Sequence, residues 1–241
     1  MRKKIFAASD IHGHFTEFKN ALDTAGFESG NPNHLLVFCG DLFDRGNENM
    51  KVMQFFERIS NCVMIRGNHE DMLLKIFDDG RLKEHNYTNG TLTTIAEFFG
   101  KYAVDAVGSI DFSGKSRTVD RITDLIMQMR DYYETEHYIF VHGWLPNRSG
   151  SIHNEWKHAS DADWKNARFT KWAEAYYGDE PVKGKTIVCG HLPTFFAKRF
   201  DEQRGDMEVS PFYGKGIIAI DGGTDVTGKV NVIVLEDKLI I

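Results

Sequence analysis

The sequence has few cysteines and no long apolar run. Its 241 residues include three cysteines, Cys39, Cys62 and Cys189, and each lies in or at the end of an apolar segment. An odd number of such thiols argues against a disulfide framework and favours a reducing compartment. No segment approaches the roughly 20 apolar residues of a membrane span, and the apolar part of the N-terminus is too short for a signal peptide. We therefore expect a soluble, cytoplasmic protein.

The sequence also has no excess of basic charge. It contains 29 Lys and Arg against 35 Asp and Glu, a net charge of -6, and the two signs are mixed along the chain. This pattern gives no indication of a nucleic-acid or membrane partner. A hydrophobic content of 41% supports a sizeable core. We interpret residues 1–241 as a single domain, with a less readable, cap-like region within about 81–185.

The first 80 residues contain three strand–helix units. Apolar runs at 4–9, 35–39 and 62–65 predict strands. A helix is predicted after each strand by apolar residues at helical spacing, over about 15–25, 50–59 and 72–77. Repeated strand–helix units favour parallel strands with right-handed crossovers. The fold class is therefore predicted to be α/β.

The second half of the chain is more varied. Strands are predicted at 138–141, 186–189 and 217–220, followed by a terminal β-pair formed by 230–235 and 239–241. Helices are predicted over 91–99, over 120–132 and near 168–176. Three tryptophans lie eight residues apart, a spacing that suits one helical face and indicates packing rather than a base-stacking platform: Trp156, Trp164 and Trp172.

Polar side chains follow nearly every predicted strand. They are Asp10 and His12, Asp41 and Asp44, Asn68 and His69, His142, and His191. One such histidine is more often a hydrogen-bonded core residue, but five motifs in order are difficult to explain in that way. Oxygen and imidazole ligands without thiolates suit Mn, Fe, Zn or Mg. One carboxylate can bridge two ions about 3.5–4 Å apart. Because parallel strand ends meet at one edge of a sheet, we predict a dinuclear metal site there.

The motifs themselves resemble those of a known family. They read Asp10-x-His12-Gly13, Gly40-Asp41-x-x-Asp44-Arg45-Gly46, Arg66-Gly67-Asn68-His69-Glu70, His142-Gly143 and Gly190-His191. This set resembles the five blocks of the calcineurin-like metallophosphoesterases, in the branch of the serine/threonine phosphoprotein phosphatases and the symmetrical diadenosine tetraphosphatases. The resemblance extends from about residue 4 to about residue 223. It implies a four-layer α/β/β/α sandwich of two mixed sheets, with the dinuclear site at the strand ends.

The resemblance also implies a role for each motif residue. The implied first metal is held by Asp10, His12 and Asp41, and the second by Asp41, Asn68, His142 and His191. His69 is implied to be the general acid and Asp44 its orienting carboxylate, while Arg45 and Asn68 are implied to bind substrate. The chemistry agrees, because two cations generate hydroxide from water at neutral pH and imidazole can protonate a leaving alkoxide. Manganese is the favoured metal; iron, zinc and magnesium are the alternatives.

The sequence departs from the wider family at its last block. Many members carry a second histidine there, whereas this chain reads Gly190-His191-Leu192-Pro193. The first metal therefore has fewer protein ligands, which predicts the weaker of the two sites. The branch also uses a second phosphate-binding arginine from the later half of the chain. Arg168 is the favoured candidate and Arg148 the alternative; either could instead be a solvated surface charge.

These features favour a hydrolase that uses a metal-bridging hydroxide without a covalent enzyme intermediate. The favoured activity is that of a serine/threonine protein phosphatase, with a phosphoprotein or a small phosphate ester as substrate. The alternative is a symmetrical dinucleoside tetraphosphate hydrolase. A third interpretation, a metal-bound module without turnover, is disfavoured because no ligand or acid position is missing. The region from 81 to 185 decides between the first two, and its sequence contains no motif that separates them.

Overall fold

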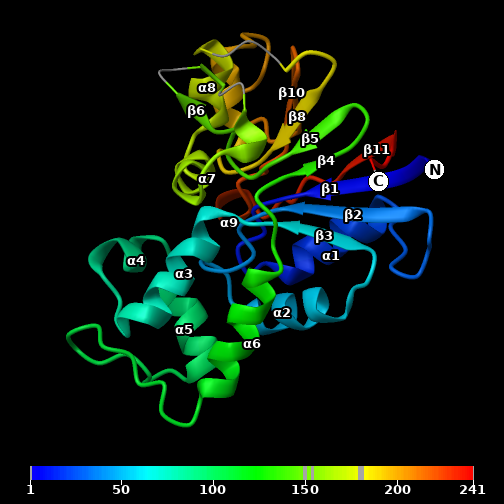
Figure 1. Cartoon of the computed structure of the whole chain (residues 1–241). Helices are drawn as coiled ribbons and strands as arrows, with labels where there is room; N and C mark the ends of the chain where they lie inside the picture. Colours follow the sequence, from blue (N-terminus) through cyan, green and yellow to red (C-terminus); the bar gives the residue numbers. More distant parts are fainter. Residues whose placement is uncertain (1, 149–150, 153–154, 179–181, 241) are drawn as a thin grey trace.

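Two mixed β-sheets lie face to face, and helices cover the outer side of each (Figure 1). The computed structural model describes residues 2–148, 151–152, 155–178 and 182–240. The first sheet has the strand order β11-β1-β2-β3, in which only β11 is antiparallel to its neighbour. Its strands are β1 (Arg2–Ala8), β2 (His34–Cys39), β3 (Cys62–Ile65) and β11 (Ile233–Lys238).

The second sheet has the order β4-β5-β8-β10-β9. Its three central strands are parallel, and its two edge strands are antiparallel to them. The strands are β4 (Tyr133–Glu134), β5 (Tyr138–Phe140), β8 (Thr186–Cys189), β9 (Phe212–Gly214) and β10 (Ile217–Ala219). A separate small pair is formed by β6 (Asn147–Arg148) and β7 (Ser151–Ile152).

The helices form two outer layers. The first sheet is covered by a layer built largely from α1 (Phe15–Thr24), α2 (Asn49–Arg58), α3 (Asn68–Asp79), α4 (Glu84–Thr88), α5 (Thr91–Phe99) and α6 (Ser116–Met127). The second sheet is covered by η1 (Trp156–His158), α7 (Asp161–Arg168), α8 (Trp172–Gly178) and η2 (Thr194–Arg199). The short α9 (Thr224–Thr227) follows β10. None of the described helices has the length and apolarity needed to cross a membrane.

The central strands are buried on both faces. In β1, Phe6 and Ala8 pack under the first helical layer, whereas Ile5 and Ala7 face the second sheet. The apolar layer between the sheets contains residues of both, including Val37 of β2. Strands covered on both sides read as continuous apolar runs, which explains why the sequence pattern located them. The predicted α/β fold with two mixed sheets and flanking helices is confirmed.

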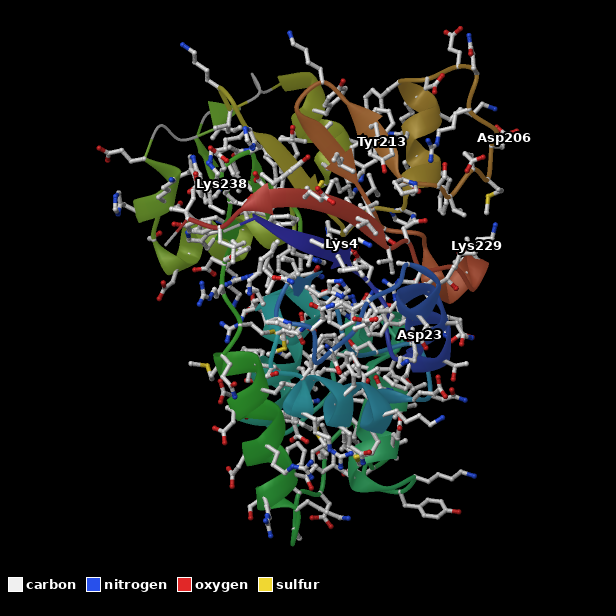
Figure 2. The ribbon with its side chains drawn as sticks, turned by 90° about the vertical axis from the view of Figure 1, so that its right-hand side faces the viewer. Lys4, Asp23, Asp206, Tyr213, Lys229 and Lys238 are labelled. Atoms are coloured by element: carbon white, nitrogen blue, oxygen red, sulfur yellow. The ribbon has the colours of Figure 1, made fainter. Side chains whose placement is uncertain are left out.

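The predicted terminal β-pair is wrong. Residues 233–238 form the single strand β11, which runs antiparallel along the free edge of β1 (Figure 2). The polar residues that suggested a turn lie within this strand, where Glu236 pairs with Lys4 and Lys238 with Arg2. An edge strand tolerates charged residues because one of its edges faces solvent.

The helices of the later half also differ from the prediction. The helix expected near 168–176 is α8, which begins at Trp172, and a helix that was not predicted, α7, precedes it. The three evenly spaced tryptophans therefore do not share one helical face, although all three are buried in the apolar layer over the second sheet. The helix expected over 120–132 is α6, which begins and ends earlier. The sequence contained no clear signal for α4, which has only five residues.

Candidate metal centre

The predicted site residues meet where the parallel strands of both sheets end. Asp10 and His12 follow β1, and Asp41 and Asp44 follow β2. Asn68 and His69 open α3 directly after β3. The second sheet contributes His142 after β5 and His191 after β8. The carboxyl ends of parallel strands are where sheets of this kind bind ligands.

The backbone at these strand ends is strained. Among the described residues, only six that are not glycine have a positive φ angle, and all six belong to the predicted motifs: Asp10, His12, Asp41, Asp44, Arg45 and His191. Such conformations cost about 1–3 kcal/mol each and persist where the surrounding structure requires them. The strain turns the side chains of both sheets toward one another. Gly67 is required for a different reason, close approach, since a Cβ atom there would lie 2.1 Å from Asp41 Oδ1.

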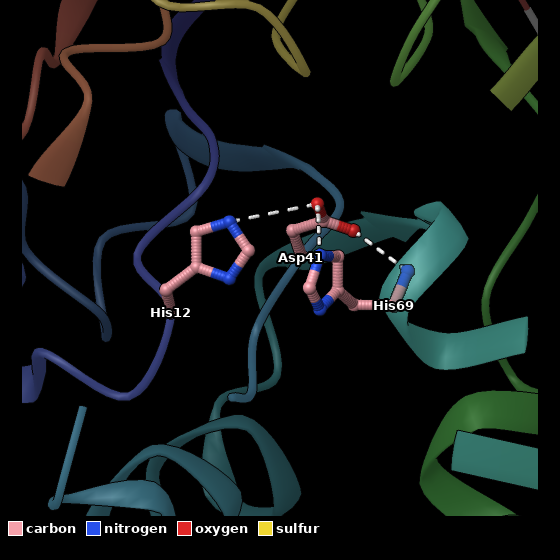
Figure 3. Close-up of side chains that lie close together, drawn as sticks. All are labelled: His12, Asp41 and His69. Carbon is pink, nitrogen blue, oxygen red and sulfur yellow. Dashed lines mark hydrogen bonds and ion pairs between the residues drawn. The ribbon is translucent and has the colours of Figure 1, made fainter. Parts of the chain in front are cut away.

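Asp41 lies at the centre of the cluster (Figure 3). Its Oδ2 atom is 3.6 Å from His12 Nε2 and 3.9 Å from His69 Nε2, and its Oδ1 atom is 3.4 Å from His142 Nε2. The backbone N–H of His69, at the start of α3, donates to Asp41 Oδ1 at 3.1 Å. Burial would raise the pKa of Asp41, but the surrounding histidines hold it well below its usual range. The carboxylate is therefore ionised and offers both oxygens.

Backbone carbonyls orient two of the imidazoles. His12 Nδ1 donates to the Phe43 carbonyl at 3.0 Å, and His142 Nδ1 donates to the Cys39 carbonyl at 2.7 Å. The Nε2 atom of each ring consequently points at Asp41. A histidine that ligates a metal is typically held by such a bond on its other nitrogen.

The surroundings of His142 Nε2 test whether the site fits a cation. This atom is 2.8 Å from Asn68 Oδ1 and 3.4 Å from Asp41 Oδ1, although both are acceptors. With Nδ1 already donating, three lone pairs converge unless a proton or a metal ion lies among them. Burial alone would lower the pKa of His142, but Asp41 outweighs it and raises the pKa to about 10. Nitrogen and oxygen lone pairs in this arrangement fit a divalent cation.

Asp10 and His191 complete the predicted set. The backbone N–H of His191 lies 3.1 and 3.0 Å from the two carboxylate oxygens of Asp10, which joins the two sheets. Burial and the nearby Asp41 raise the pKa of Asp10 to about 6. Burial and the nearby His142 lower the pKa of His191 to about 4, so its ring is neutral and able to ligate at neutral pH. Each residue thus presents a group that a cation would stabilise.

Two groups of side chains have metal-binding geometry and share Asp41. One contains His12, Asp41 and His69, and the other contains Asp41, His142 and His191; the ligand atoms of each group lie within 4.8 Å of one another. This arrangement agrees with two ions bridged by Asp41. The first group contains His69, whereas the predicted ligands of the first metal were Asp10, His12 and Asp41. Asp10 reaches the cluster from the other side, through His191.

His69 is paired with Asp44 as predicted for a general acid and its orienting carboxylate. His69 Nδ1 donates to Asp44 Oδ2 at 2.7 Å, and both side chains are buried. Burial would lower the pKa of His69, but Asp41 and Asp44 raise it above its usual value. The Nε2 atom on the other side of the ring faces the Asp41 carboxylate.

The two predicted phosphate-binding arginines have different surroundings. Arg45 is partly exposed at the site, and its guanidinium is 3.1 Å from the carboxylate of Asp225 in α9. Arg168 is buried and pairs with Asp71 at 2.9 Å and with Asp131 at 2.6 Å. The Arg168 side chain therefore extends from the end of α7 toward α3, and each of its terminal nitrogens is paired with a carboxylate. The alternative, Arg148, lies in β6, and its side chain is outside the described part of the structure.

Several residues of the site were not identified from the sequence. Glu70 accepts hydrogen bonds from the backbone N–H groups of Asp41, Leu42 and Gly67 at 2.8–3.0 Å, which fixes the loop after β2. Its signal was available, because a glutamate at the third position of a helix commonly binds back to the preceding backbone. Thr91 and Thr94 of α5 contact Asp44, and their sequence neighbourhood contains no recognised motif.

A family model described as calcineurin-like phosphoesterase matches residues 3–219. A relative from Coxiella burnetii (strain RSA 331), named bis(5'-nucleosyl)-tetraphosphatase, symmetrical, is 22% identical over 215 residues, which is 86% of this chain and 67% of the relative. A relative of the same name from Aromatoleum aromaticum is 37% identical, but over only 30% of this chain and 26% of its own length.

Solved structures agree in fold. One titled a putative diadenosine tetraphosphatase superposes with a TM-score of 0.60 at 16% identity, covering 99% of this chain and 94% of that one. At such identities the likeness establishes the fold alone.

Proposed function

Since the chain belongs to the calcineurin-like phosphoesterases, we propose that it hydrolyses phosphate esters or anhydrides with two divalent metal ions. The observation that supports this most directly is the convergence of lone pairs on His142 Nε2, which a cation would resolve. Manganese is the favoured metal, since the donors are oxygen and imidazole nitrogen. The proposed ligands are Asp10, His12, Asp41, Asn68, His142 and His191.

Different residues of this chain would have separate roles in the reaction. The ions, when bound, supply electrostatic stabilisation and a water of lowered pKa. His69 donates a proton from Nε2 to the departing oxygen, and Asp44 holds the opposite ring nitrogen. Arg45 binds phosphate oxygens, in competition with Asp225 for its guanidinium. We also propose that Asn68 and Arg168 contribute to substrate binding.

For the substrate we propose a dinucleoside polyphosphate, which reverses the order that the sequence favoured. The curated relatives reported above carry the name of a symmetrical tetraphosphatase. A cavity of about 170 Å³ also lies between α3, α4 and α7. Its lining includes the basic side chains Lys75, Arg81, Lys83 and Lys165 and the carboxylates of Asp71 and Asp79, of which Asp79 pairs with Lys75 and Lys83. Positive charge there suits a substrate with several phosphates.

Hydrolysis of a phosphoprotein is the second candidate function, because His69 is paired with Asp44. A terminal phosphate of a nucleoside diphosphate departs readily without protonation, whereas the alkoxide of serine or threonine requires a proton. A well-positioned general acid is therefore most useful on phosphomonoesters. The chemistry of the leaving group therefore favours a phosphomonoester, whereas the basic cavity favours a polyphosphate.

The test is turnover of two substrates by the purified, manganese-loaded chain: diadenosine tetraphosphate and a phosphothreonine peptide. We expect faster cleavage of the dinucleotide into two diphosphates, and a raised KM for it in Lys165→Ala but not in Lys101→Ala, an exposed lysine on a distant loop. Faster dephosphorylation of the peptide would restore the protein phosphatase assignment. Failure on both substrates and on p-nitrophenyl phosphate would overturn the proposed function.

We also propose that residues 1–241 act as one domain in the cytoplasm, without a nucleic-acid or membrane partner. All three cysteines are free, as expected in a reducing compartment. Cys39 and Cys189 are the last residues of β2 and β8, and both are fully buried.

A further inference from the structure

Helix α5 presents a row of polar side chains to the loop that carries Asp44. Thr91, Thr94 and Glu97 follow one another at a spacing of three, so they lie on neighbouring turns of one face. Both threonines are completely buried. Their neighbours on the buried side of the helix are apolar, including Ile95. Buried hydroxyls on such a helix indicate a specific polar partner.

That partner is the carboxylate of Asp44. Thr94 Oγ1 donates to Asp44 Oδ1 at 2.8 Å, and Thr91 Oγ1 donates to Asp44 Oδ2 at 3.0 Å. His69 Nδ1 donates to the same Oδ2 at 2.7 Å. Asp44 is 1% exposed, and these three donors surround it. The carboxylate is therefore fixed in orientation by groups on two different helices, α3 and α5.

The direction of the Thr94 hydrogen bond follows from a second contact. The backbone N–H of Asp44 donates to Thr94 Oγ1 at 2.9 Å. The hydroxyl has one hydrogen, so it accepts from the backbone and gives that hydrogen to Asp44 Oδ1. The carboxylate must consequently act as an acceptor on this side. Its other oxygen is turned toward His69 Nδ1, which leaves His69 Nε2 directed at Asp41.

Glu97 secures the same loop from its far end. Its carboxylate accepts from the backbone N–H groups of Asn49 and Met50 at 2.8 and 2.9 Å, and so ties the start of α2 to α5. Asn49 Oδ1 in turn accepts from the Asp44 backbone at 3.2 Å. The loop between β2 and α2, where Asp44 and Arg45 have strained backbones, is thus held against α5 along its length.

We propose that Thr91 and Thr94 are positioning residues for proton donation by His69, which they control through Asp44. The inference rests on the proposed function, because it concerns the general acid of the same reaction. It assigns a catalytic consequence to a helix in the region from 81 to 185, whose sequence contains no active-site motif. The two hydroxyls contact Asp44 and would act on His69 only through it.

The test uses Thr94→Val, Thr91→Val and the double variant, which keep the side-chain shape and remove the hydroxyl. Turnover is measured with aryl phosphates of graded leaving-group acidity. We expect kcat for phenyl phosphate to fall roughly tenfold to hundredfold in the double variant, within the range that general acids contribute. We expect a loss below about threefold for p-nitrophenyl phosphate, whose leaving group needs little protonation, and hence a steeper dependence on leaving-group acidity.

Two comparisons separate positioning from a merely structural role. In a His69→Asn background the threonine substitutions should lower kcat no further, since the group they position is absent. Thr94→Ser, which retains the hydroxyl, should restore the dependence on leaving-group acidity. Thr88→Val serves as the matched control, because that hydroxyl binds only the His85 carbonyl.

The outcomes are distinguishable. If the wild-type chain turns over none of these substrates, the proposed function fails. If the wild type is active but the double variant loses equal activity on all leaving groups, or loses as much again in the His69→Asn background, the inference fails. Metal content and melting temperature are measured on each variant, so that an unfolded or metal-free protein is recognised.

Discussion

Among the described residues, two clusters of acidic and imidazole side chains meet the geometric condition for a metal ion, and they differ in their hydrogen bonds. One surrounds Asp41 at the strand ends; the other joins Glu136, His137 and Asp237 at the opposite end of the sheets. In both, the ligand atoms of each group lie within 4.8 Å of one another. In both, the central aspartate is almost completely buried. Proximity of acidic and imidazole groups therefore does not separate them.

The hydrogen bonds do separate them. Asp237 accepts from Thr135 Oγ1, from the His137 backbone and from His137 Nδ1, each at 2.7 Å, so its carboxylate is satisfied without a cation. Around Asp41, by contrast, two oxygen acceptors converge on the buried His142 Nε2, where only a proton or a metal ion satisfies them. Within the described residues, the strained non-glycine backbone is confined to the Asp41 side. A carboxylate filled by its own hydrogen-bond donors needs no cation, whereas oxygen acceptors that converge on a buried imidazole stabilise positive charge between them.

The largest effect should come from replacing Asp41, with the same substitution at Asp237 as the control. Asp41→Asn should lower kcat/KM by at least about 10³-fold, because the substitution removes a charge that both ions would share. Metal content, measured by elemental analysis, should fall in parallel. Asp237→Asn should leave both quantities unchanged. Equal metal loss in the two variants would mean that the corner cluster also binds metal and that hydrogen-bond satisfaction is a poor criterion.

His69→Asn should separate metal binding from proton donation within the Asp41 cluster. We expect wild-type metal content and a loss of roughly 10²–10⁴-fold in kcat on alkyl phosphates, with a smaller loss on p-nitrophenyl phosphate. The readout is the ratio of the two losses at saturating manganese. A uniform loss on both substrates would remove the general-acid role and leave His69 as a ligand of the first group.

Metal removal should destabilise the protein through the Asp41 cluster alone. At a free manganese concentration of 100 times Kd, bound metal contributes about 2.7 kcal/mol, or roughly 5–10 °C in melting temperature for a chain of this size. Chelation should therefore lower the melting temperature of the wild type and of Asp237→Asn by the same amount. It should have little effect on Asp41→Asn. A chelator response that persists in Asp41→Asn would place the stabilising metal elsewhere.

The smallest effect should be the loss of stability in Asp237→Asn, about 2 kcal/mol at pH 7. Burial would raise the pKa of Asp237, but hydrogen bonds from Thr135 and His137 hold it below its usual value. A carboxylate with a lowered folded pKa stabilises the protein above its unfolded pKa, and this stabilisation is lost as pH falls through the folded pKa. The difference between wild type and variant, measured by urea unfolding, should therefore shrink below about pH 4. A pH-independent difference would point to packing instead of charge.

The strands buried on both faces and the motifs after them were predicted because both depend on local pattern, whereas the short strands β4, β6, β7 and β9 were not predicted. Strands buried on both faces are continuous apolar runs, and each run is followed by its polar motif. The strand β11 was mispredicted because the polar residues Glu236 and Lys238 suggest a turn. The sequence pattern does not show that this segment pairs with the edge of β1. The helix α7 was missed although its start has a local signal, the capping box of Ser160 and Asp163.

The same distinction holds within the site. Asp10, His12, Asp41, Asn68, His142 and His191 were named from their places after strands, since strand ends in a parallel sheet converge whatever the intervening sequence. The contact of Thr91 and Thr94 with Asp44, and the capture of Arg168 by Asp71 and Asp131, join residues 37 to 97 positions apart. Neither has a periodicity or motif that a linear pattern could reveal.

The amino-acid sequence by itself thus determined the fold class, the family and the polar residue types that follow the strands. Those properties follow from the order of apolar runs and the residue types at their ends. Only the tertiary structure decided which buried aspartate is satisfied and which is not, because hydrogen-bond partners come from distant elements. It also decided that α5 holds the Asp44 loop, since that contact exists only once α5 packs beside α2.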